Sequence, residues 1–171
     1  RNGTIKSFQK ISSTQGNFGG ILDDYDNFGF SVSFVGDLDG DTIPDVVVGS
    51  YADDDGGTNR GAIWILYLNS NGTVKSYSKI SSTQGNFSGI LDDGDYFGIS
   101  LSSIGDLNGD GGFPDLVVGV WGDDDGGTNR GSAWILFRTP PPTSSTSSTS
   151  TTTTTTSTTT TTFPSFSFSL F

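Results

Sequence analysis

Residues 28–50 read FGFSVSFVGDLDGDTIPDVVVGS, and residues 97–120 read FGISLSSIGDLNGDGGFPDLVVGV. The second stretch repeats the first with one inserted residue, and the likeness extends beyond both. Residues 2–41 align with 71–110 with 29 of 40 positions identical, and residues 44–68 align with 114–138 with 17 of 25 identical. Two tandem copies of one unit of about 70 residues, about 1–68 and 69–138, therefore fill this part of the chain.

Each copy carries the pattern of β-strands. Runs rich in β-branched and aromatic residues predict strands at 28–35, 45–50, 62–68 and 73–80, and again at 97–104, 115–120 and 132–138. Asn71-Gly72 between two of these runs predicts a type I′ hairpin. Ala occurs only three times, so helix formers are scarce. We therefore predict an all-β fold, a propeller or stacked array built from two four-stranded units.

Strand counting leaves the two units unequal. Residues 4–11 read as the fourth strand of a preceding unit, whereas the last unit has three strands before the prolines at 140–142. The orphan strand and the missing strand are complementary, so another copy of the chain could supply the complement in a head-to-tail contact. The alternative is a piece cut from a longer array, and the sequence favours neither.

Aromatic residues recur at equivalent positions of the two copies. Stacked β-units need aromatic packing between them, so we expect these side chains in the core. They are Phe8, Phe18, Phe28, Trp64, Tyr77, Phe87, Phe97 and Trp134.

The composition excludes several classes of function. All 19 acidic residues are Asp, and the net charge of −11 argues against a nucleic-acid partner. The absence of His and Cys removes the commonest general base and the ligands that zinc and copper prefer. No apolar run is long enough to span a membrane. Paired carboxylates could in principle act as acid and base, but no nucleophile constellation accompanies them, and we do not expect an enzyme.

The strongest candidate site is the Asp-rich loop at 37–45. Carboxylates at its positions 1, 3, 5 and 9, with the carbonyl of position 7, can surround one Ca²⁺ ion, which prefers oxygen ligands. The alternative is a solvated loop of Asx turns. The second loop has Asn in place of one carboxylate and one inserted residue, so we expect weaker binding there. The candidate ligands are Asp37, Asp39, Asp41, Ile43 and Asp45 in the first loop, and Asp106, Asn108, Asp110, Gly112 and Asp115 in the second.

Two further acidic runs, at 53–55 and 123–125, each precede Gly-Gly-Thr-Asn-Arg-Gly. Consecutive carboxylates of an extended chain cannot all face one ion, so we predict solvated acidic turns. Arg60 and Arg130 could each pair with an Asp of the same loop.

The order of these features resembles the FG-GAP repeats of the integrin α-subunit β-propeller. Phe28-Gly29 and Phe97-Gly98 precede the Asp-rich loops, and the following apolar strands end at Gly49 and Gly119. The family has Gly-Ala-Pro at that place, and this sequence matches it only at Gly. The resemblance covers residues 1–138. It implies four-stranded blades, calcium in the inter-strand loop and usually seven blades in a closed ring, for which this chain has too few.

The composition changes abruptly after residue 138. The linker at 139–162 has prolines at 140–142 and then twenty Ser and Thr at 143–162, which resembles the O-glycosylated linkers of mucin-like stalks. Residues 163–171 alternate apolar residues with Ser, which predicts a docking strand with Phe166, Phe168 and Leu170 as its assembly face. Three sequons make Asn2, Asn71 and Asn86 candidates for N-glycosylation. The O-glycosylation candidates are Thr143, Thr146, Thr149, Thr151, Thr152, Thr153, Thr154, Thr155, Thr156, Thr158, Thr159, Thr160, Thr161 and Thr162.

Two functional hypotheses follow. The first is an extracellular or cell-surface structural subunit, calcium-stabilised and carrying covalent glycans, that assembles head to tail with copies of itself into a fibril or coat. The second is a fragment of a larger integrin-like β-propeller that binds a protein or glycan ligand in adhesion.

Overall fold

The computed structural model describes residues 2–138. The Ser/Thr-rich linker with its O-glycosylation candidates and the predicted docking strand (Phe166, Phe168, Leu170) lie outside the described residues. Within the described range no helix is long and apolar enough to cross a membrane.

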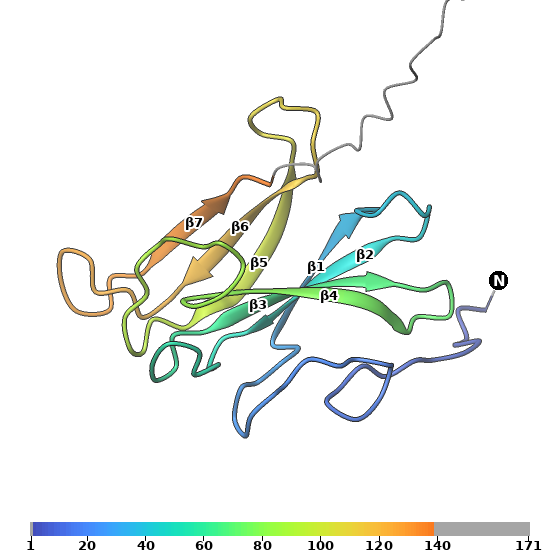
Figure 1. The fold of residues 1–171 in the computed structure, drawn as a ribbon, viewed down its shortest axis with the longest axis horizontal. Helices are drawn as coiled ribbons and strands as arrows, with labels where there is room; N and C mark the ends of the chain where they lie inside the picture. Colours follow the sequence, from blue (N-terminus) through green and yellow to red (C-terminus); the bar gives the residue numbers. More distant parts are fainter. Residues whose placement is uncertain (1, 139–171) are drawn as a thin grey trace, which may run out of the picture. The chain divides into compact units, whose positions relative to one another are not determined.

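Seven strands form two antiparallel sheets (Figure 1). The first sheet has the order β1-β2-β3-β4, with β1 at Ser31–Gly36, β2 at Asp45–Ser50, β3 at Ala62–Leu68 and β4 at Val74–Ser81. The second has the order β5-β6-β7, with β5 at Phe97–Gly105, β6 at Asp115–Val120 and β7 at Ser132–Leu136. The all-β prediction is confirmed, and the two sheets are consistent with one four-stranded and one three-stranded propeller blade.

Three predicted strands, at 45–50, 62–68 and 115–120, have the bounds seen in the structure. The first strand begins at Ser31 rather than at residue 28, because a turn precedes it. In that turn Asn27 and Gly29 have positive φ angles of 57° and 93°, and the Phe30 N–H donates to the Asn27 carbonyl at 3.1 Å. Residues 4–11 are not a strand, since no neighbouring strand pairs with them in the described part of the chain.

The turn between β3 and β4 differs from the predicted type I′ hairpin. The Gly72 N–H donates to the Asn69 carbonyl and the Asn69 N–H to the Thr73 carbonyl, each at 2.8 Å. Gly72 has a positive φ of 81°, but Asn71 does not. A type I′ turn needs positive φ at both central residues, so this is a longer loop that closes on a left-handed glycine.

One core joins the two sheets. Val47, Ile63 and Ile65 of the first sheet pack with Leu116 and Val118 of the second, and all five are buried. This continuous core explains why the two repeats form one compact unit.

The opposite face of the first sheet is covered by Phe18. Its ring packs against Phe28 at 5.1 Å, Trp64 at 5.1 Å and Tyr77 at 5.2 Å between centroids. The expected core role is thus confirmed for Phe18, Trp64 and Phe97, and wrong for Phe8, which is 93% exposed.

The backbones of the two blades come close together at Gly98. The Ser31 hydroxyl donates to the Gly98 carbonyl at 2.7 Å, and a Cβ on Gly98 would lie 2.6 Å from the Ala62 carbonyl oxygen. The φ of Gly98 is 89°, which only glycine adopts readily. This contact sets β5 against the first sheet.

Candidate metal centre

The loop between β1 and β2 is held by the side chain of Asp37. One carboxylate oxygen accepts hydrogen bonds from the N–H groups of Gly40 at 2.8 Å and Asp41 at 3.1 Å. The other accepts from the Thr42 N–H at 2.7 Å. Thr42 has a φ of 71°, where the second loop has Gly111 at the same angle. Thr42, a β-branched residue, therefore adopts a left-handed conformation. The Asp37 carboxylate stabilises this conformation by accepting the hydrogen bond of the Thr42 N–H.

Asp45 closes the loop from inside the protein. It is fully buried, and its two oxygens accept from the Leu38 N–H at 2.8 Å and the Leu68 N–H at 2.9 Å. Burial raises the pKa of Asp45, as do the nearby charges of Asp39 and Asp41, although the two N–H donors oppose them. A cation bound near the Asp45 carboxylate would therefore favour its ionised form.

Three carboxylates of the loop converge. One oxygen from each of Asp37, Asp39 and Asp45 lies within 4.8 Å of the other two. Calcium binds oxygens at about 2.3–2.6 Å, so oxygens this far apart can share one ion. Within residues 2–138 this is the one group of three acidic residues with that geometry. The donor set and the spacing fit Ca²⁺, and the carbonyl of Ile43 stays a predicted ligand.

Lys75 of β4 neutralises the outer part of the loop. Its ammonium lies 2.8 Å from an Asp39 oxygen and 2.7 Å from an Asp41 oxygen. The pKa of Asp41 is lowered, first by its hydrogen bond with Lys75 and then by the Ile43 N–H. The two carboxylates raise the pKa of Lys75 in turn. No local sequence pattern predicted this contact, although β4 begins at the same end of the sheet as the loop.

The second loop, between β5 and β6, keeps the scaffold of the first. Asp106 accepts from the N–H groups of Gly109 at 2.7 Å and Gly111 at 2.9 Å, and Asp110 from that of Gly112 at 2.7 Å. Asp115 accepts from the N–H groups of Leu107 and Arg138, both at 2.9 Å, and the Arg138 bond is the main cause of its lowered pKa.

Asn108 changes the charge of the second loop. Its amide donates to Asp110 at 2.9 Å, where the first loop has a lysine ammonium between two carboxylates. With one carboxylate fewer, the second loop stays the weaker calcium candidate.

The acidic runs at 53–55 and 123–125 are only partly the solvated turns that we predicted, since Asp54, Asp124 and Asp125 are exposed but the first residue of each run is not. Asp53 and Asp123 are buried. The Lys79 ammonium lies 2.8 Å from Asp53 and 2.7 Å from Asp55, and its side chain is only 7% exposed. In the first run, the ammonium of Lys79 lies between the carboxylates of Asp53 and Asp55, so these two side chains can face the same cation. Arg60 pairs with Asp93 of another loop at 2.8 Å, not with its own loop.

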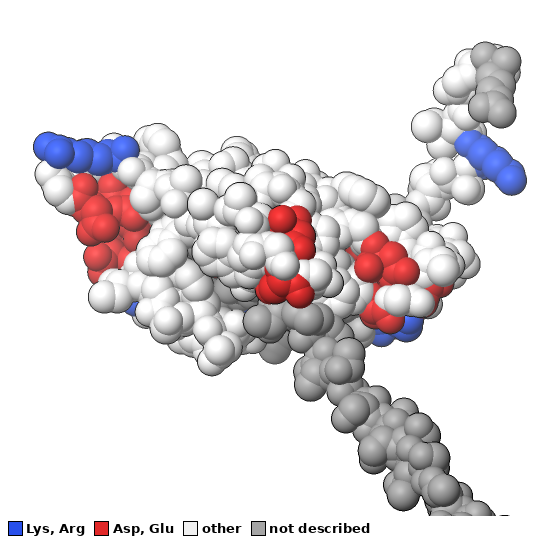
Figure 2. Space-filling view, turned by 90° about the horizontal axis from the view of Figure 1, so that it is seen from above, with Lys and Arg blue, Asp and Glu red and all other residues white. Residues whose placement is uncertain are grey.

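Figure 2 shows the acidic side chains gathered in separate clusters with basic side chains at some of their edges. The predicted N-glycosylation residues Asn2, Asn71 and Asn86 are all exposed. Their modification stays a prediction.

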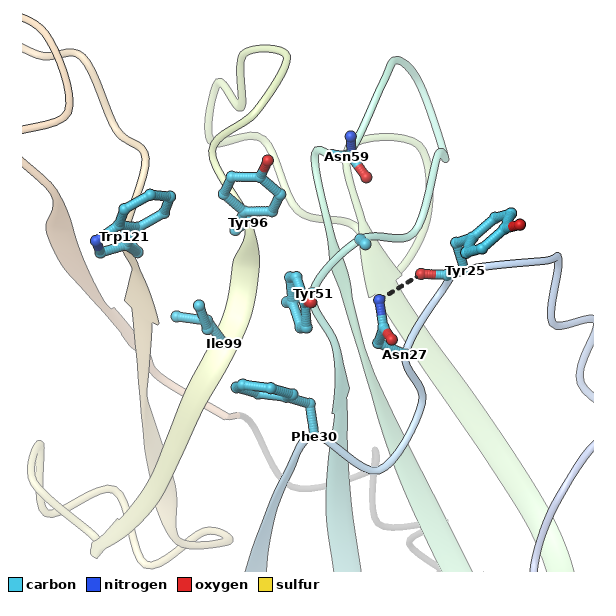
Figure 3. A pocket seen from close by; sticks show the side chains of 9 residues that line it. Tyr25, Asn27, Phe30, Tyr51, Asn59, Tyr96, Ile99 and Trp121 are labelled. Atoms are coloured by element: carbon cyan, nitrogen blue, oxygen red, sulfur yellow. Dashed lines mark hydrogen bonds between the residues drawn. The ribbon is translucent and has the colours of Figure 1, made fainter.

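An aromatic groove lies at the end of the strands opposite to the Asp-rich loops (Figure 3). Its volume is about 500 Å³. Tyr51 packs against Phe30 at 4.6 Å and Tyr96 at 5.6 Å, and Tyr96 packs against Trp121 at 5.6 Å. Phe30 and Trp121 remain exposed. The groove was not predicted from the sequence, although Tyr51 and Trp121 directly follow the equivalent strands β2 and β6.

Comparison with known proteins agrees with this architecture. Residues 28–66 match the family model of the FG-GAP repeat. The chain is 35% identical over 103 residues to integrin alpha-5 of Xenopus laevis, covering 60% of this chain and 9% of that protein. It is 40% identical over 99 residues to integrin alpha-7 of Homo sapiens, covering 58% of this chain and 8% of that protein.

The chain therefore contains an integrin-type FG-GAP segment. It spans less than a tenth of the length of these relatives.

Proposed function

We propose, starting from the integrin-type FG-GAP segment, that this chain is a calcium-stabilised part of a cell-surface β-propeller that binds a protein or glycan ligand in adhesion. The observation that carries the proposal is the Asp37–Asp45 loop, whose carboxylates converge inside the repeat matched at residues 28–66. The integrin names of the relatives support the adhesive role and the extracellular location. A non-catalytic role is part of the same proposal.

Bound calcium would supply a positive charge that offsets the mutual repulsion of the loop carboxylates. Asp37, Asp39 and Asp45 would hold it with the oxygens that already converge. Asp41 would join them once Lys75 turns away, since the lysine ammonium now lies between Asp39 and Asp41. Because Lys75 offers a competing positive charge, we expect it to weaken calcium binding rather than to help it.

The aromatic groove is the best candidate for the ligand surface. Partly exposed Phe30 and Trp121 flank Tyr51 and Tyr96, and the amide of Asn59 also lines the groove (Figure 3). Aromatic faces with a few polar groups suit a sugar ring or an amphipathic protein side chain.

The calcium proposal is tested by thermal unfolding. We expect added Ca²⁺ to raise the melting temperature of the chain and EDTA to lower it. The double variant Asp39→Ala, Asp41→Ala removes two carboxylates of the loop and should unfold at the same temperature with or without EDTA. An EDTA-insensitive melting temperature of the unmodified chain would contradict the proposal.

Two variants sharpen this test. Asp24→Ala removes an exposed carboxylate outside the loop and should leave the calcium response intact. Lys75→Gln removes the competing ammonium and should lower the calcium concentration needed for half of the stabilisation.

The ligand surface is tested by binding to a glycan or protein array. We expect calcium-dependent binding that is lost in Trp121→Ala but retained in Ile90→Ala. An equal loss in both variants would contradict it.

A further inference from the structure

The second blade has an open edge and an open face. Among residues 2–138, β7 pairs only with β6, whereas the equivalent β3 pairs with both β2 and β4. Ile135 of β7 is 46% exposed, but its counterpart Ile65 of β3 is 4% exposed. The same sequence unit thus buries this face in the first blade and leaves it uncovered in the second.

Within residues 2–138 the chain also contains a strand sequence that pairs with neither sheet. Residues 2–12 read NGTIKSFQKIS and repeat residues 71–81, NGTVKSYSKIS, which contain β4. In β4 the side chains of Val74 and Lys79 are buried, whereas the equivalent Ile5 is largely exposed and residue 10 is exposed. An exposed amphipathic segment of this kind is suited to pairing with a free sheet edge.

Residues 2–12 are attached to the first blade, whereas the open edge of β7 belongs to the second. The Val74 N–H donates to the Gly16 carbonyl, and the Asn17 amide donates to the Val74 carbonyl, both at 2.8 Å. Residues 16 and 17 are thus tied to the beginning of β4 in the first blade. Residues 2–12, which we call the orphan segment, therefore extend from the first blade, while the open edge belongs to the second sheet.

Two hollows beside Trp134 match two side chains of the orphan segment. The first, of about 560 Å³, is lined by Phe87, Trp134 and Leu136. In the first blade Tyr77 occupies the equivalent place, with its ring 5.2 Å from Phe18 and 5.5 Å from Trp64. Phe8 is the counterpart of Tyr77 in the orphan segment.

The second hollow, of about 660 Å³, is acidic. It is lined by Trp134 with Asp92, Asp95 and the run at 123–125. In the first blade Lys79 occupies this place, paired with Asp53 and Asp55 and 4.9 Å above the Trp64 ring. Lys10 is the counterpart of Lys79. The open edge therefore has both the shape and the charge that the orphan segment would complete.

We propose that residues 4–12 of a second copy of this chain pair antiparallel with β7, as β4 pairs with β3. Transfer of the β3–β4 register places Gln9 opposite Ile135, Phe8 opposite Leu136 and Lys10 opposite Trp134. Lys10 then lies between Asp123 and Asp125. Each copy offers one strand and one edge, so the contact is head to tail and extends into a ring or a filament.

A charge exchange tests the contact without disturbing the fold. We expect the unmodified full chain, with calcium present, to show a mass in sedimentation that grows with concentration. Lys10→Glu should stay monomeric, because a further negative charge would enter a hollow that is already lined by five Asp residues. The double variant Lys10→Glu, Asp125→Lys should assemble again. Tyr25→Ser, which removes an exposed aromatic side chain outside the contact, is the control and should assemble normally.

A disulfide tests the register, since the chain has no native Cys. Two single-cysteine chains, Gln9→Cys and Ile135→Cys, are mixed under mild oxidation. They should cross-link between copies much more than the mixture of Gln9→Cys with Ala133→Cys, which is shifted by two residues. A cysteine pair directly opposite on neighbouring strands has the Cα separation that a disulfide needs.

Three results would overturn the proposal. The first is an unmodified chain that remains monomeric at every concentration. The second is assembly that persists in Lys10→Glu, and the third is assembly that requires residues 163–171 but not Lys10, which would identify the C-terminal segment as the occupant. Because calcium is present throughout, none of these results bears on the calcium proposal.

Discussion

Asp26 is a buried carboxyl group whose surroundings favour its protonated form. Its side chain accepts one hydrogen bond, from the Asp23 N–H at 2.8 Å, and its neighbours include Asp53 and Asp23. Burial is the main cause that raises the pKa of Asp26 to about 6 from 3.8, and the two nearby carboxylates add to it. Folding therefore takes up a proton at this position.

This uptake predicts a pH dependence of known sign. Between pH 3.8 and about 6 the folded chain binds the proton of Asp26 more tightly than the unfolded chain does, so the free energy of unfolding falls as the pH rises through that range. Asp26→Asn cannot titrate and keeps an acceptor for the Asp23 N–H. In urea unfolding at several pH values, its stability should fall less than that of the unmodified chain over this range.

The matched variant is Asp24→Asn, which changes an exposed carboxyl group two residues away. We expect its pH profile to run parallel to that of the unmodified chain. A profile of Asp26→Asn that also runs parallel would show that Asp26 ionises in the folded protein at its ordinary pKa.

At the scale of single residues the sequence predicted that the loop carboxylates cluster, but it did not predict the contacts of the lysines. Spacing alone was enough to group Asp37, Asp39 and Asp45, because loop residues close in sequence are also close in space. The contacts of Lys75 with Asp39 and of Lys79 with Asp53 join positions more than twenty residues apart, so they depend on strand pairing. No local pattern could show them.

Among the elements, the contact of β5 with the first sheet depends on Gly98. Gly29 is its counterpart in the first repeat, has a similar φ of 93°, and a Cβ there would meet no atom within 4 Å. Alanine substitutions at Gly29 and Gly98 therefore distinguish the cost of the backbone conformation alone from the added cost of steric overlap. Gly29→Ala should cost about 1–2 kcal/mol for the left-handed conformation. Gly98→Ala should cost clearly more, because its methyl group would meet the Ala62 carbonyl.

The measurement is chemical unfolding of both variants in the Lys10→Glu background, which should keep the chain monomeric. Equal destabilisation by the two substitutions would mean that the blades do not approach as closely at Gly98 as the structure shows.

At this scale the sequence predicted best the strands that have a paired neighbour on each side within the described residues. The central strands β2, β3 and β6 have the expected bounds, since continuous apolar runs leave little choice of register. Residues 4–11 carry the same pattern as β4 but form no strand. A strand pattern describes a preference that only a partner strand can satisfy.

For the whole described molecule, the shared core predicts a single unfolding transition. Leu116 is fully buried between the sheets and packs in the cluster that contains Ile63 and Ile65. Leu116→Ala should lower the stability by about 2–5 kcal/mol. Because both blades depend on this core, calorimetry should show one transition that moves as a whole, with equal calorimetric and van't Hoff enthalpies.

Ile90→Ala, at an exposed position in a loop, is the control and should change the stability little. Two separate transitions, of which Leu116→Ala shifts only one, would show that the blades fold independently. The repeat predicted the number of blades, but the sequence did not show how many residues the two blades bury together. That depends on which face of each sheet meets the other.

Asp45 joins two distant parts of the first blade through a single side chain. One of its oxygens accepts from Leu38 in the metal loop, and the other accepts from Leu68 at the end of β3. Asp115 makes the same pair of bonds in the second blade, to Leu107 and Arg138. The Asp45 carboxylate thus couples the loop between β1 and β2 to the end of β3. Under the calcium proposal, removing the ion would loosen the end of β3 that Asp45 holds, so calcium would set how firmly this part of the first blade resists a pulling force.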